Sequence, residues 1–336
     1  MAKILILGGT QWLGRTIAAQ ALDAGHAVTC LARGASGEFP AGAAAVVADR
    51  NVPGAYAEPA ADNWDLVVEL TRFPAHADSA LGALSAVAAN WAFVSSCSVY
   101  ADHSVPAATE DTDLLPPLGP AEDYSEELYG EAKSGCEALT RAIRRGSALL
   151  VRPGLIGGPG DPTGRSTYWP LRVADPREPV LVPYEAEDGE YRQHVQLIDV
   201  RDLAAFILAA GLAGRAGAVN AVGQAIPLPD ALVAAREAAH RNPQIALYPL
   251  ADMEDDGVAP WSGPRSLPLV LPLGADYAGF ARRTDARALD MGLLRRPLPE
   301  TFRDILAAEA PLAGRQLGAG LSAGDEAALL DALRQR

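Results

Sequence analysis

Short apolar runs alternate with stretches of helical periodicity over the first 150 residues of the chain. Most of these runs are continuously apolar, which is typical of strands that are buried on both faces of a parallel sheet. Strands that alternate with helices predict right-handed crossovers between parallel neighbours. The predicted strands cover 3–7, 27–31, 45–48, 66–70, 92–95 and 148–151, and the predicted helices cover 12–24, 75–88 and 125–145.

The pattern changes after Arg152. The segment "RPGLIGGPGDPTGR" is dense in glycine and proline, so we predict a loop. A strand at 193–198 and a helix at 200–212 are predicted to return to the sheet, and 218–223 is a further candidate strand. Beyond them, helices are predicted at 229–239, 284–290, 299–309 and 323–335. The sequence thus predicts an α/β fold, with a doubly wound parallel sheet from residues 1–153 and 191–223 and a smaller, mostly helical substrate domain from residues 154–190 and 224–336.

The first predicted strand runs directly into a glycine-rich turn, "LGGTQWLGR". Glycines allow a tight turn and a close approach of the backbone to a pyrophosphate, and the N-terminus of the following helix attracts phosphate. A strand, a turn and a helix in this order predict a Rossmann-type dinucleotide site. Gln11 stands where a middle glycine is common, and a negative φ would accommodate it. The predicted cofactor contacts in the turn are Gly8, Thr10, Gln11, Trp12, Leu13 and Gly14.

The end of the second predicted strand bears on the choice of dinucleotide. NAD sites place an acid there for the ribose 2′-hydroxyl, whereas NADP sites place an arginine near the 2′-phosphate. The chain reads "VTCLARGAS", so Ala32 leaves space and Arg33 offers a guanidinium. NADP(H) is therefore favoured over NAD(H). The alternative interpretation is that Arg33 is an ordinary solvated loop residue. The other cofactor contacts predicted near strand ends are Asp49, as an acceptor for the adenine amino group, Arg50, Leu70 and Thr71.

Composition argues against several classes of function. The formal net charge of −14 disfavours nucleic acid as a partner, because phosphate contacts need clustered Lys and Arg. No apolar run reaches the roughly 18 residues of a membrane span, and the N-terminus begins in a strand rather than a signal peptide. Three cysteines without metal-ligand spacing predict no metal site. We therefore expect a cytoplasmic protein that acts on a small molecule without nucleic acid or membrane as a partner.

A tyrosine and a lysine lie four residues apart in the segment "YGEAK". On a helix, Tyr129 and Lys133 share one face. A tyrosine hydroxyl needs help to act as an acid or base near pH 7, because its ordinary pKa is about 10, and a neighbouring ammonium stabilises the phenolate. Lys3 and Lys133 are the only lysines in the chain, and a compact ammonium suits this role better than a guanidinium. The strand end "FVSSCSVY" adds a serine hydroxyl that can bind a substrate oxygen. The alternative interpretation of the Tyr129 and Lys133 pair is an ordinary solvated helix face.

Together these motifs resemble the extended or atypical short-chain dehydrogenases/reductases, which include NAD-dependent epimerases and dehydratases. The resemblance covers nearly the whole chain and is carried by "GGTQWLG", "FVSSCSVY", "YGEAK", "VRPGLIGGPGDP" and "IDVRDLAAFI". More narrowly, the chain is similar to actinobacterial isoflavone-reductase-like proteins, which share the "RPLPET" pattern. The resemblance implies that Ser96, Tyr129 and Lys133 are catalytic, with Ser98 a less favoured substitute for Ser96. It also implies nicotinamide contacts from Pro153, Gly154, Leu155 and Ile156, and makes a homodimer one expected assembly.

Three departures from the nucleotide-sugar enzymes of this superfamily disfavour such a substrate. The arginine that usually binds the diphosphate ahead of the "DLA" motif is absent, and Leu197 or Val195 stands near its place. The fourth predicted strand ends in "ELTR" rather than in small residues. Cys97 follows the serine, where a dehydratase would carry an acid.

Three functions stay open. The favoured one is an NADPH-dependent reductase of a carbonyl or imine in a small molecule, for example in secondary metabolism. The first alternative is an epimerase or dehydratase with tightly bound NAD, and the second is a non-catalytic NADP-binding or RNA-associated protein. Candidate substrate contacts are Arg72, Ser98, Arg165, Tyr168, Trp169 and His194, although Tyr168 and Trp169 also fit plain packing between the domains.

Overall fold

The computed structural model describes residues 1–35, 37–185, 193–312, 315 and 317–336. Its helices are α1 (Trp12–Asp23), α2 (Pro74–Leu84), α3 (Tyr129–Arg144), α4 (Tyr168–Ala174), α5 (Val200–Leu212), α6 (Leu228–Ala239), α7 (Ala286–Asp290), α8 (Leu298–Ala308) and α9 (Ala323–Gln335). All the predicted helices are present within a few residues, and α4 is an additional one. Among the described residues, no helix is both long and apolar enough to cross a membrane.

Seven parallel strands form the large sheet, in the order β11-β6-β5-β4-β1-β2-β3. They are β1 (Lys3–Leu7), β2 (Ala27–Ala32), β3 (Ala44–Val47), β4 (Trp64–Glu69), β5 (Ala88–Val94), β6 (Ala148–Pro153) and β11 (Gly217–Ala221). The chain begins in the middle of the sheet and winds first to one side and then to the other. This arrangement confirms the predicted doubly wound, Rossmann-type fold. The strand order reverses between β1 and β4, and ligands of such sheets bind outside the carboxyl ends at this point.

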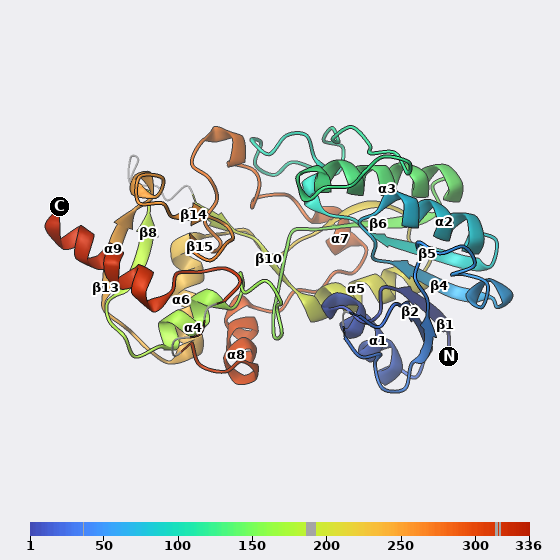
Figure 1. Cartoon of the computed structure of the whole chain (residues 1–336), viewed down its shortest axis with the longest axis horizontal. Coiled ribbons are helices and arrows are strands. Elements are labelled where there is room, and N and C mark those ends of the chain that lie inside the picture. The colour runs from blue at the N-terminus through green and yellow to red at the C-terminus, as the bar shows by residue number, and fades with distance from the viewer. Residues whose placement is uncertain (36, 186–192, 313–314, 316) are drawn as a thin grey trace.

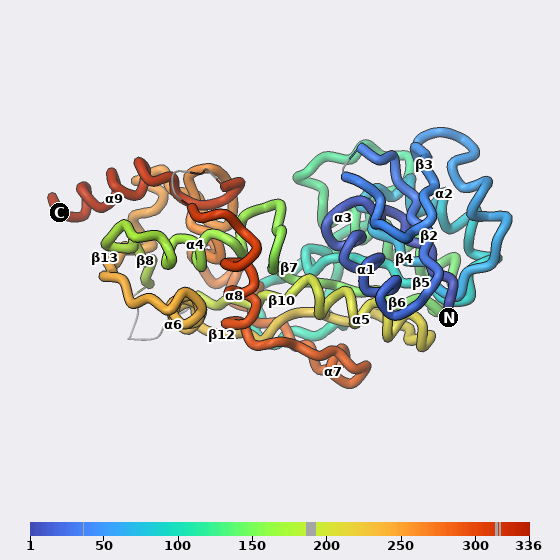
Figure 2. Tube along the Cα trace, turned by 90° about the horizontal axis from the view of Figure 1, so that it is seen from below, coloured from blue at the N-terminus to red at the C-terminus, as the bar shows by residue number. Residues whose placement is uncertain are grey.

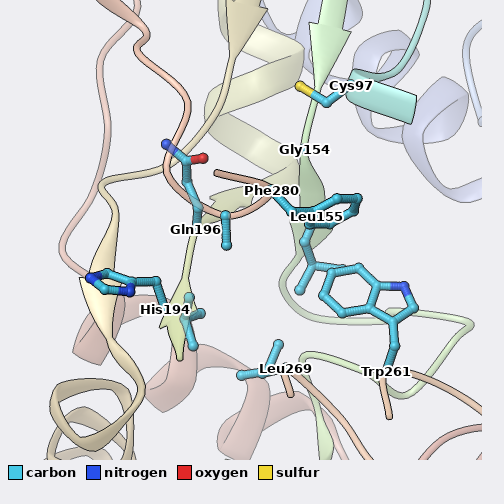
Figure 3. Close-up of a pocket in the computed structure, with 10 residues that line it drawn as sticks. Cys97, Gly154, Leu155, His194, Gln196, Trp261, Leu269 and Phe280 are labelled. Atoms are coloured by element: carbon cyan, nitrogen blue, oxygen red, sulfur yellow. The ribbon is translucent and has the colours of Figure 1, made fainter. Parts of the chain in front are cut away.

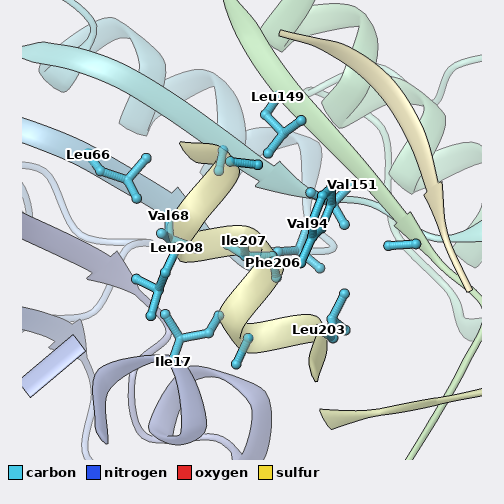
Figure 4. Packing of buried hydrophobic residues seen from close by; sticks show 14 of the residues in the cluster. Ile17, Leu66, Val68, Val94, Leu149, Val151, Leu203, Phe206, Ile207 and Leu208 are labelled. Atoms are coloured by element: carbon cyan, nitrogen blue, oxygen red, sulfur yellow. The ribbon is translucent and has the colours of Figure 1, made fainter. Parts of the chain in front are cut away.

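Helices cover both faces of the sheet. Because successive side chains of a strand point to opposite faces, Ile4 and Ile6 of β1 join one apolar cluster, whereas Leu5 and Leu7 join another. The first cluster packs under α1 and α5, and the second under α2 and α3, on the opposite side in Figure 1. In Figure 4, α5 lies across the strands with the fully buried Ile207 directed into the first cluster.

Most of the rest of the chain lies beside the sheet, as Figures 1 and 2 show, whereas α7 contacts β11 and contributes Ala288 to the first cluster. Beside the sheet, α4, α6, α8 and α9 surround a parallel pair of strands, β8 (Val180–Tyr184) and β13 (Ile245–Pro249). The Nε of the buried Arg172 in α4 lies 2.6 Å from the Oε2 of Glu326 in α9, and this ion pair joins the two helices. The N-terminus lies at the sheet end of the elongated molecule, and the C-terminus lies at the far end of α9. The boundaries of a separate substrate domain stay a prediction.

Two predictions about the connecting segments are wrong. Residues 193–198 do not rejoin the large sheet, because β9 (His194–Val195) pairs with β12 (Ile226–Pro227), and β10 (Leu197–Asp199) pairs with β7. The segment predicted as a loop after Arg152 contains this partner strand, β7 (Leu155–Gly157). Apolar runs indicate that a strand is buried, but they do not identify its partner strand. The pattern of apolar residues therefore could not predict how β9 and β10 pair. A last short pair is formed by β14 (Ala259–Pro260) and β15 (Ser266–Leu267).

A buried ion pair ties the segment after β3 to the end of β4. The Arg50 guanidinium donates to both carboxylate oxygens of Glu69, at 2.9 and 2.5 Å, and also to the Tyr56 hydroxyl and the His76 carbonyl. The Glu69 side chain is 1% exposed and the Arg50 side chain 11%. Removing one partner of such a pair leaves a desolvated charge without compensation.

We expect Glu69→Gln to lower the free energy of unfolding by about 3–5 kcal/mol, because it leaves the Arg50 charge buried and unpaired. Asp62→Asn is the matched control, since the Asp62 pair with Lys3 is solvent-exposed on both sides and should change stability little. Urea unfolding followed by circular dichroism measures both. Equal effects of the two substitutions would contradict the structural role of the buried pair.

Candidate functional site

The carboxyl ends of the parallel strands meet at one edge of the sheet. The strand register aligns Leu31, Leu7, Glu69, Phe93 and Leu150 in a single row across β2, β1, β4, β5 and β6. The glycine turn, the segment after β4 and the serine-rich segment after β5 all leave the sheet just beyond this row. The predicted cofactor residues and the predicted catalytic residues therefore gather at the same edge.

The glycine turn has the shape that a pyrophosphate requires. Gly8 has a φ of 107°, which L side chains rarely adopt. A Cβ on Gly14 would lie 2.3 Å from the Gly8 carbonyl oxygen, so glycine is needed for α1 to start this close to β1. Gln11 has a φ of −88° and makes no side-chain capping bond, so the N–H groups at the start of α1 stay available to an anion. The turn fits a dinucleotide, and the Gln11 backbone does not obstruct it.

The indole of Trp12 holds a second segment against this turn. Its Nε1 donates to the Pro159 carbonyl at 2.9 Å, and the backbone of Gly160 lies against the same ring. The loop after β7 therefore crosses the start of α1. Of the other predicted contacts in the turn, Thr10 is buried and Leu13 half-buried.

The residues predicted near the adenosine follow β2 and β3. Arg33 is exposed directly after β2. The Asp49 carboxylate accepts from the backbone N–H and the side-chain amide of Asn51, both at 2.9 Å. These hydrogen bonds, assisted by the charge of Arg33, hold the pKa of Asp49 below its usual value. Arg50 is instead engaged by Glu69, because a buried carboxylate attracts the guanidinium inward, so the structure gives no support to its predicted cofactor contact.

Helix α3 begins against the serine-rich turn. A Cβ on Gly130 would lie 2.5 Å from the Ser98 carbonyl oxygen, so the glycine next to Tyr129 permits this contact. The Ser96 Oγ accepts from the Ser98 N–H and donates to the Ser98 Oγ, both at 3.1 Å. Tyr129 is half-buried, and its hydroxyl makes no hydrogen bond within the described part of the chain. The structure thus brings both candidate serines and Tyr129 to one place.

Lys133 lies one helical turn beyond Tyr129 and is 4% exposed. Its Nζ donates to the carbonyl oxygens of Thr71 and Val94, each at 2.7 Å. These bonds use two of the three donors of the ammonium and leave one for a ligand. Thr71 therefore contributes a carbonyl that positions Lys133, whereas Leu70 packs against the glycine turn.

A mainly apolar cavity of about 340 Å³, including its part open to solvent, lies at this edge (Figure 3). Cys97 lies at one end, and the wall continues through the segment after β6 to β9 and the irregular chain between β14 and α7. Gly154, Leu155 and His194, which were predicted at the site, are thereby brought together, while Pro153 and Ile156 lie in the adjoining strands β6 and β7. The lining residues are Cys97, Gly154, Leu155, His194, Val195, Gln196, Trp261, Leu269, Phe280 and Ala281.

Sequence reasoning missed Trp261, Leu269 and Phe280, because they lie in a proline-rich stretch without periodicity. The rings of Trp261 and Phe280 meet edge to face with centroids 5.4 Å apart. Trp261 and Leu269 both have a φ of 69°, a conformation that costs bulky residues of the order of 1–3 kcal/mol each and is concentrated at functional sites. Two strained backbone positions on one wall make this cavity a candidate functional site.

The remaining residues that were predicted to contact the substrate lie in different surroundings. Tyr168 and Trp169 are each 1% exposed within the apolar core of the part beside the sheet, so packing explains both. Arg72 is exposed and pairs at 3.1 Å with an acid that precedes α3. The Arg165 guanidinium lies over the Trp261 ring, 5.1 Å from its centroid, at the cavity wall. Within the described ranges, no group of His, Cys, Asp or Glu could hold a metal ion.

Comparison with known families agrees with this geometry. The model described as "NAD dependent epimerase/dehydratase family" matches residues 4–223, about two thirds of the chain. The chain belongs to this family. Membership confirms the resemblance to extended short-chain dehydrogenases/reductases, and it implies that this epimerase/dehydratase-family protein uses a nicotinamide dinucleotide.

Solved structures share the fold over almost the whole molecule. The UDP-Glc/GlcNAc 4-epimerase from Campylobacter jejuni is 15% identical, with a TM-score of 0.67, over 91% of this chain and 98% of that one. The UDP-N-acetylglucosamine 4-epimerase from Bacillus cereus is 14% identical, with a TM-score of 0.64, over 92% and 100%. The Thermus thermophilus UDP-glucose 4-epimerase, solved with NAD, is 17% identical, with a TM-score of 0.57, over 91% and 98%. No curated protein sequence matches the chain.

Gly14→Ala should weaken the binding of NAD(H) and NADP(H) by about tenfold or more, because the added Cβ overlaps the Gly8 carbonyl and pushes α1 away. Gly82→Ala on α2 is the control, since a Cβ there meets nothing within 4 Å. Calorimetric titration with each dinucleotide measures the effect. Unchanged affinity in folded Gly14→Ala protein would show that the turn is not the pyrophosphate site.

Proposed function

We propose that this epimerase/dehydratase-family protein interconverts hydroxyl-bearing small molecules without net oxidation or reduction. One observation carries the proposal: α3 places Tyr129 and Lys133 on one face and begins against the turn that contains Ser96. Family membership over 4–223 favours internal return of the hydride over net reduction. The epimerase names of the structural neighbours agree with this choice.

Nicotinamide dinucleotides supply reversible hydride transfer when bound. The residues of this chain manage the accompanying proton and charge. Tyr129 takes the substrate hydroxyl proton on its Oη and returns it to the product oxygen. Lys133, fixed by the Thr71 and Val94 carbonyls, lends its positive charge to the phenolate form of Tyr129, which accepts the proton and thereby becomes neutral. The Ser96 Oγ donates a hydrogen bond to the substrate oxygen while that oxygen carries developing negative charge.

The cavity is consistent with these roles of Tyr129, Lys133 and Ser96. Its apolar wall excludes water from the reacting carbon, and electrostatic effects are stronger in such surroundings than in water. Gly154 and Leu155 bring the segment predicted to contact the nicotinamide to the same cavity that Cys97, the neighbour of Ser96, lines. A substrate in the cavity therefore lies between the predicted cofactor segment and the serine-rich turn.

Tyr129→Phe should slow the half-reaction by about 10²–10⁴-fold and leave dinucleotide affinity within a few-fold of the wild-type value. The half-reaction is the reduction of bound NAD by a panel of hydroxylated compounds that includes UDP-glucose, followed by nicotinamide absorbance. Tyr277→Phe is the matched control, because Tyr277 is exposed on the surface. A rate that Tyr129→Phe leaves unchanged would overturn the assignment.

A second candidate function is an NADPH-dependent reductase, and one specific observation favours it. The end of β2 offers Arg33, exposed and following Ala32, with no carboxylate at that strand end. An arginine in this place suits a 2′-phosphate. The two candidates differ in which dinucleotide the protein retains and in whether added NADPH is consumed in stoichiometric amounts.

If the reductase is correct, Arg33→Ala should weaken NADPH binding about tenfold, because it removes a charge-assisted hydrogen bond to the 2′-phosphate, and should leave NADH binding unchanged. Fluorescence titration with the two dinucleotides measures the ratio. Equal affinity of the wild-type protein for NADH and NADPH, with no response to the substitution, would remove the support for NADP.

A further inference from the structure

Two guanidinium groups lie at the cavity without a carboxylate within salt-bridge distance in the described part of the chain. Three other arginines with largely buried side chains are paired with acids, because burial makes an unpaired charge costly. The protein as a whole carries an excess of acid, with a net charge of −14. Arg165 and Arg283 differ from these three arginines in having no acid beside them within the described residues. The paired examples are Arg50 with Glu69, Arg152 with Glu137 and Arg172 with Glu326.

Arg165 has an acid in its own loop, but that acid is occupied. The Asp161 carboxylate accepts from the backbone N–H and the hydroxyl of Thr163 and of Ser166, at 2.7–3.0 Å. The Nε of Arg165 donates to the Thr163 hydroxyl at 3.1 Å, and neither Nη atom bonds to any residue that the structure describes. Burial lowers the pKa of Arg165, and the negative charge of Asp161 opposes this shift. The open end of this guanidinium is therefore available to a ligand beside the Trp261 ring.

Arg283 is a buried charge, 3% exposed. Its Nη2 donates to the Asp102 carbonyl and the His103 Nδ1, at 2.9 and 2.8 Å, and its guanidinium stacks 3.8 Å from the Tyr100 ring centroid. The Nε and Nη1 are buried without any hydrogen-bond partner among the described residues. Burial, together with the Arg283 charge, lowers the pKa of His103 to about 4, so His103 is neutral at pH 7 and its ring adds no further positive charge.

The Arg283 charge lies directly behind the cavity wall. Gln196, which lines the cavity, accepts from the Arg283 backbone N–H at 3.0 Å and donates to the Arg283 carbonyl at 2.7 Å. Phe280 and Ala281, just before Arg283 in the chain, also line the cavity. An uncompensated charge behind a low-dielectric wall raises the positive potential inside the cavity.

We infer that the cavity binds a small carboxylate whose apolar body carries a ring. The carboxylate pairs with the free Nη atoms of Arg165, since a guanidinium fork matches a carboxylate in a bidentate pair. The ring packs on Trp261 and Phe280, and Arg283 adds positive potential. The lining is mainly apolar, which suits an apolar ring better than the sugar and the diphosphate of a nucleoside diphosphate sugar. This inference rests on the proposed function and names its substrate class.

The test uses 3-phenylpropionate, its primary amide and UDP-glucose as probes, titrated calorimetrically into the full-length protein with its dinucleotide bound. The carboxylate should bind at least about tenfold more tightly than the isosteric amide. Arg165→Gln should abolish this preference, Arg165→Lys should restore part of it through charge alone, and Arg283→Gln should weaken carboxylate binding several-fold. Arg215→Gln is the matched control, because Arg215 is an exposed arginine at the opposite edge of the sheet, before β11.

Equal binding of the amide and the carboxylate, or binding of UDP-glucose alone, would overturn the inference. So would an unchanged preference in folded Arg165→Gln protein. Because binding is read without turnover, the titration does not depend on the hydride-transfer step. A failure of the hydride-transfer proposal would therefore be seen in the half-reaction alone, and a failure of the carboxylate inference in the titration alone.

Discussion

The architecture of the site depends on the bonds that Lys133 makes with two strand ends. Thr71 follows β4 and Val94 is the last residue of β5, so one buried ammonium links α3 to both strand ends. Gly130 complements this link, since its missing side chain lets the start of α3 close onto the Ser98 backbone. Both contacts follow Tyr129 in the helix and together they fix the start of α3. Catalytic geometry depends on positions held to a fraction of an ångström, and here the end of β5 and the segments after β4 and β5 provide them.

The part of the molecule nearest the N-terminus was the most predictable. Continuous apolar runs, helical periodicity and a glycine turn are local signals, so β1, α1 and the doubly wound order of the sheet followed from them. Tyr129 and Lys133 were also predictable, because a helix brings positions four apart together whatever surrounds it. The cavity wall was not, because Trp261, Leu269 and Phe280 reach the site through tertiary packing of an irregular segment. Likewise, no pattern in the sequence showed that Glu69 would bind Arg50, or that β10 would pair with β7.

Charge is distributed unevenly through this acidic protein. Away from the cavity, ion pairs such as that of Arg172 with Glu326 join helices that are far apart in the sequence. Near the cavity, the carboxylate of Asp161 is used up by the turn that it stabilises, and the thiol of Cys97 stays neutral because burial raises its pKa to about 12. Acidic side chains that are engaged in ion pairs and turns do not neutralise the unpaired arginines at the cavity. These arginines therefore attract anions from solution.

The hydrogen bond from the Trp12 indole to Pro159 connects two stretches of chain with different tasks. Trp12 opens the helix that follows the predicted pyrophosphate turn, and Pro159 belongs to the loop that leads to Asp161 and Arg165. Through this bond the start of α1 is in direct contact with the loop that carries Arg165, whose guanidinium lies at the cavity wall. A single indole–carbonyl bond thus joins the glycine turn to the cavity, so the two halves of the candidate site are held together by one side chain.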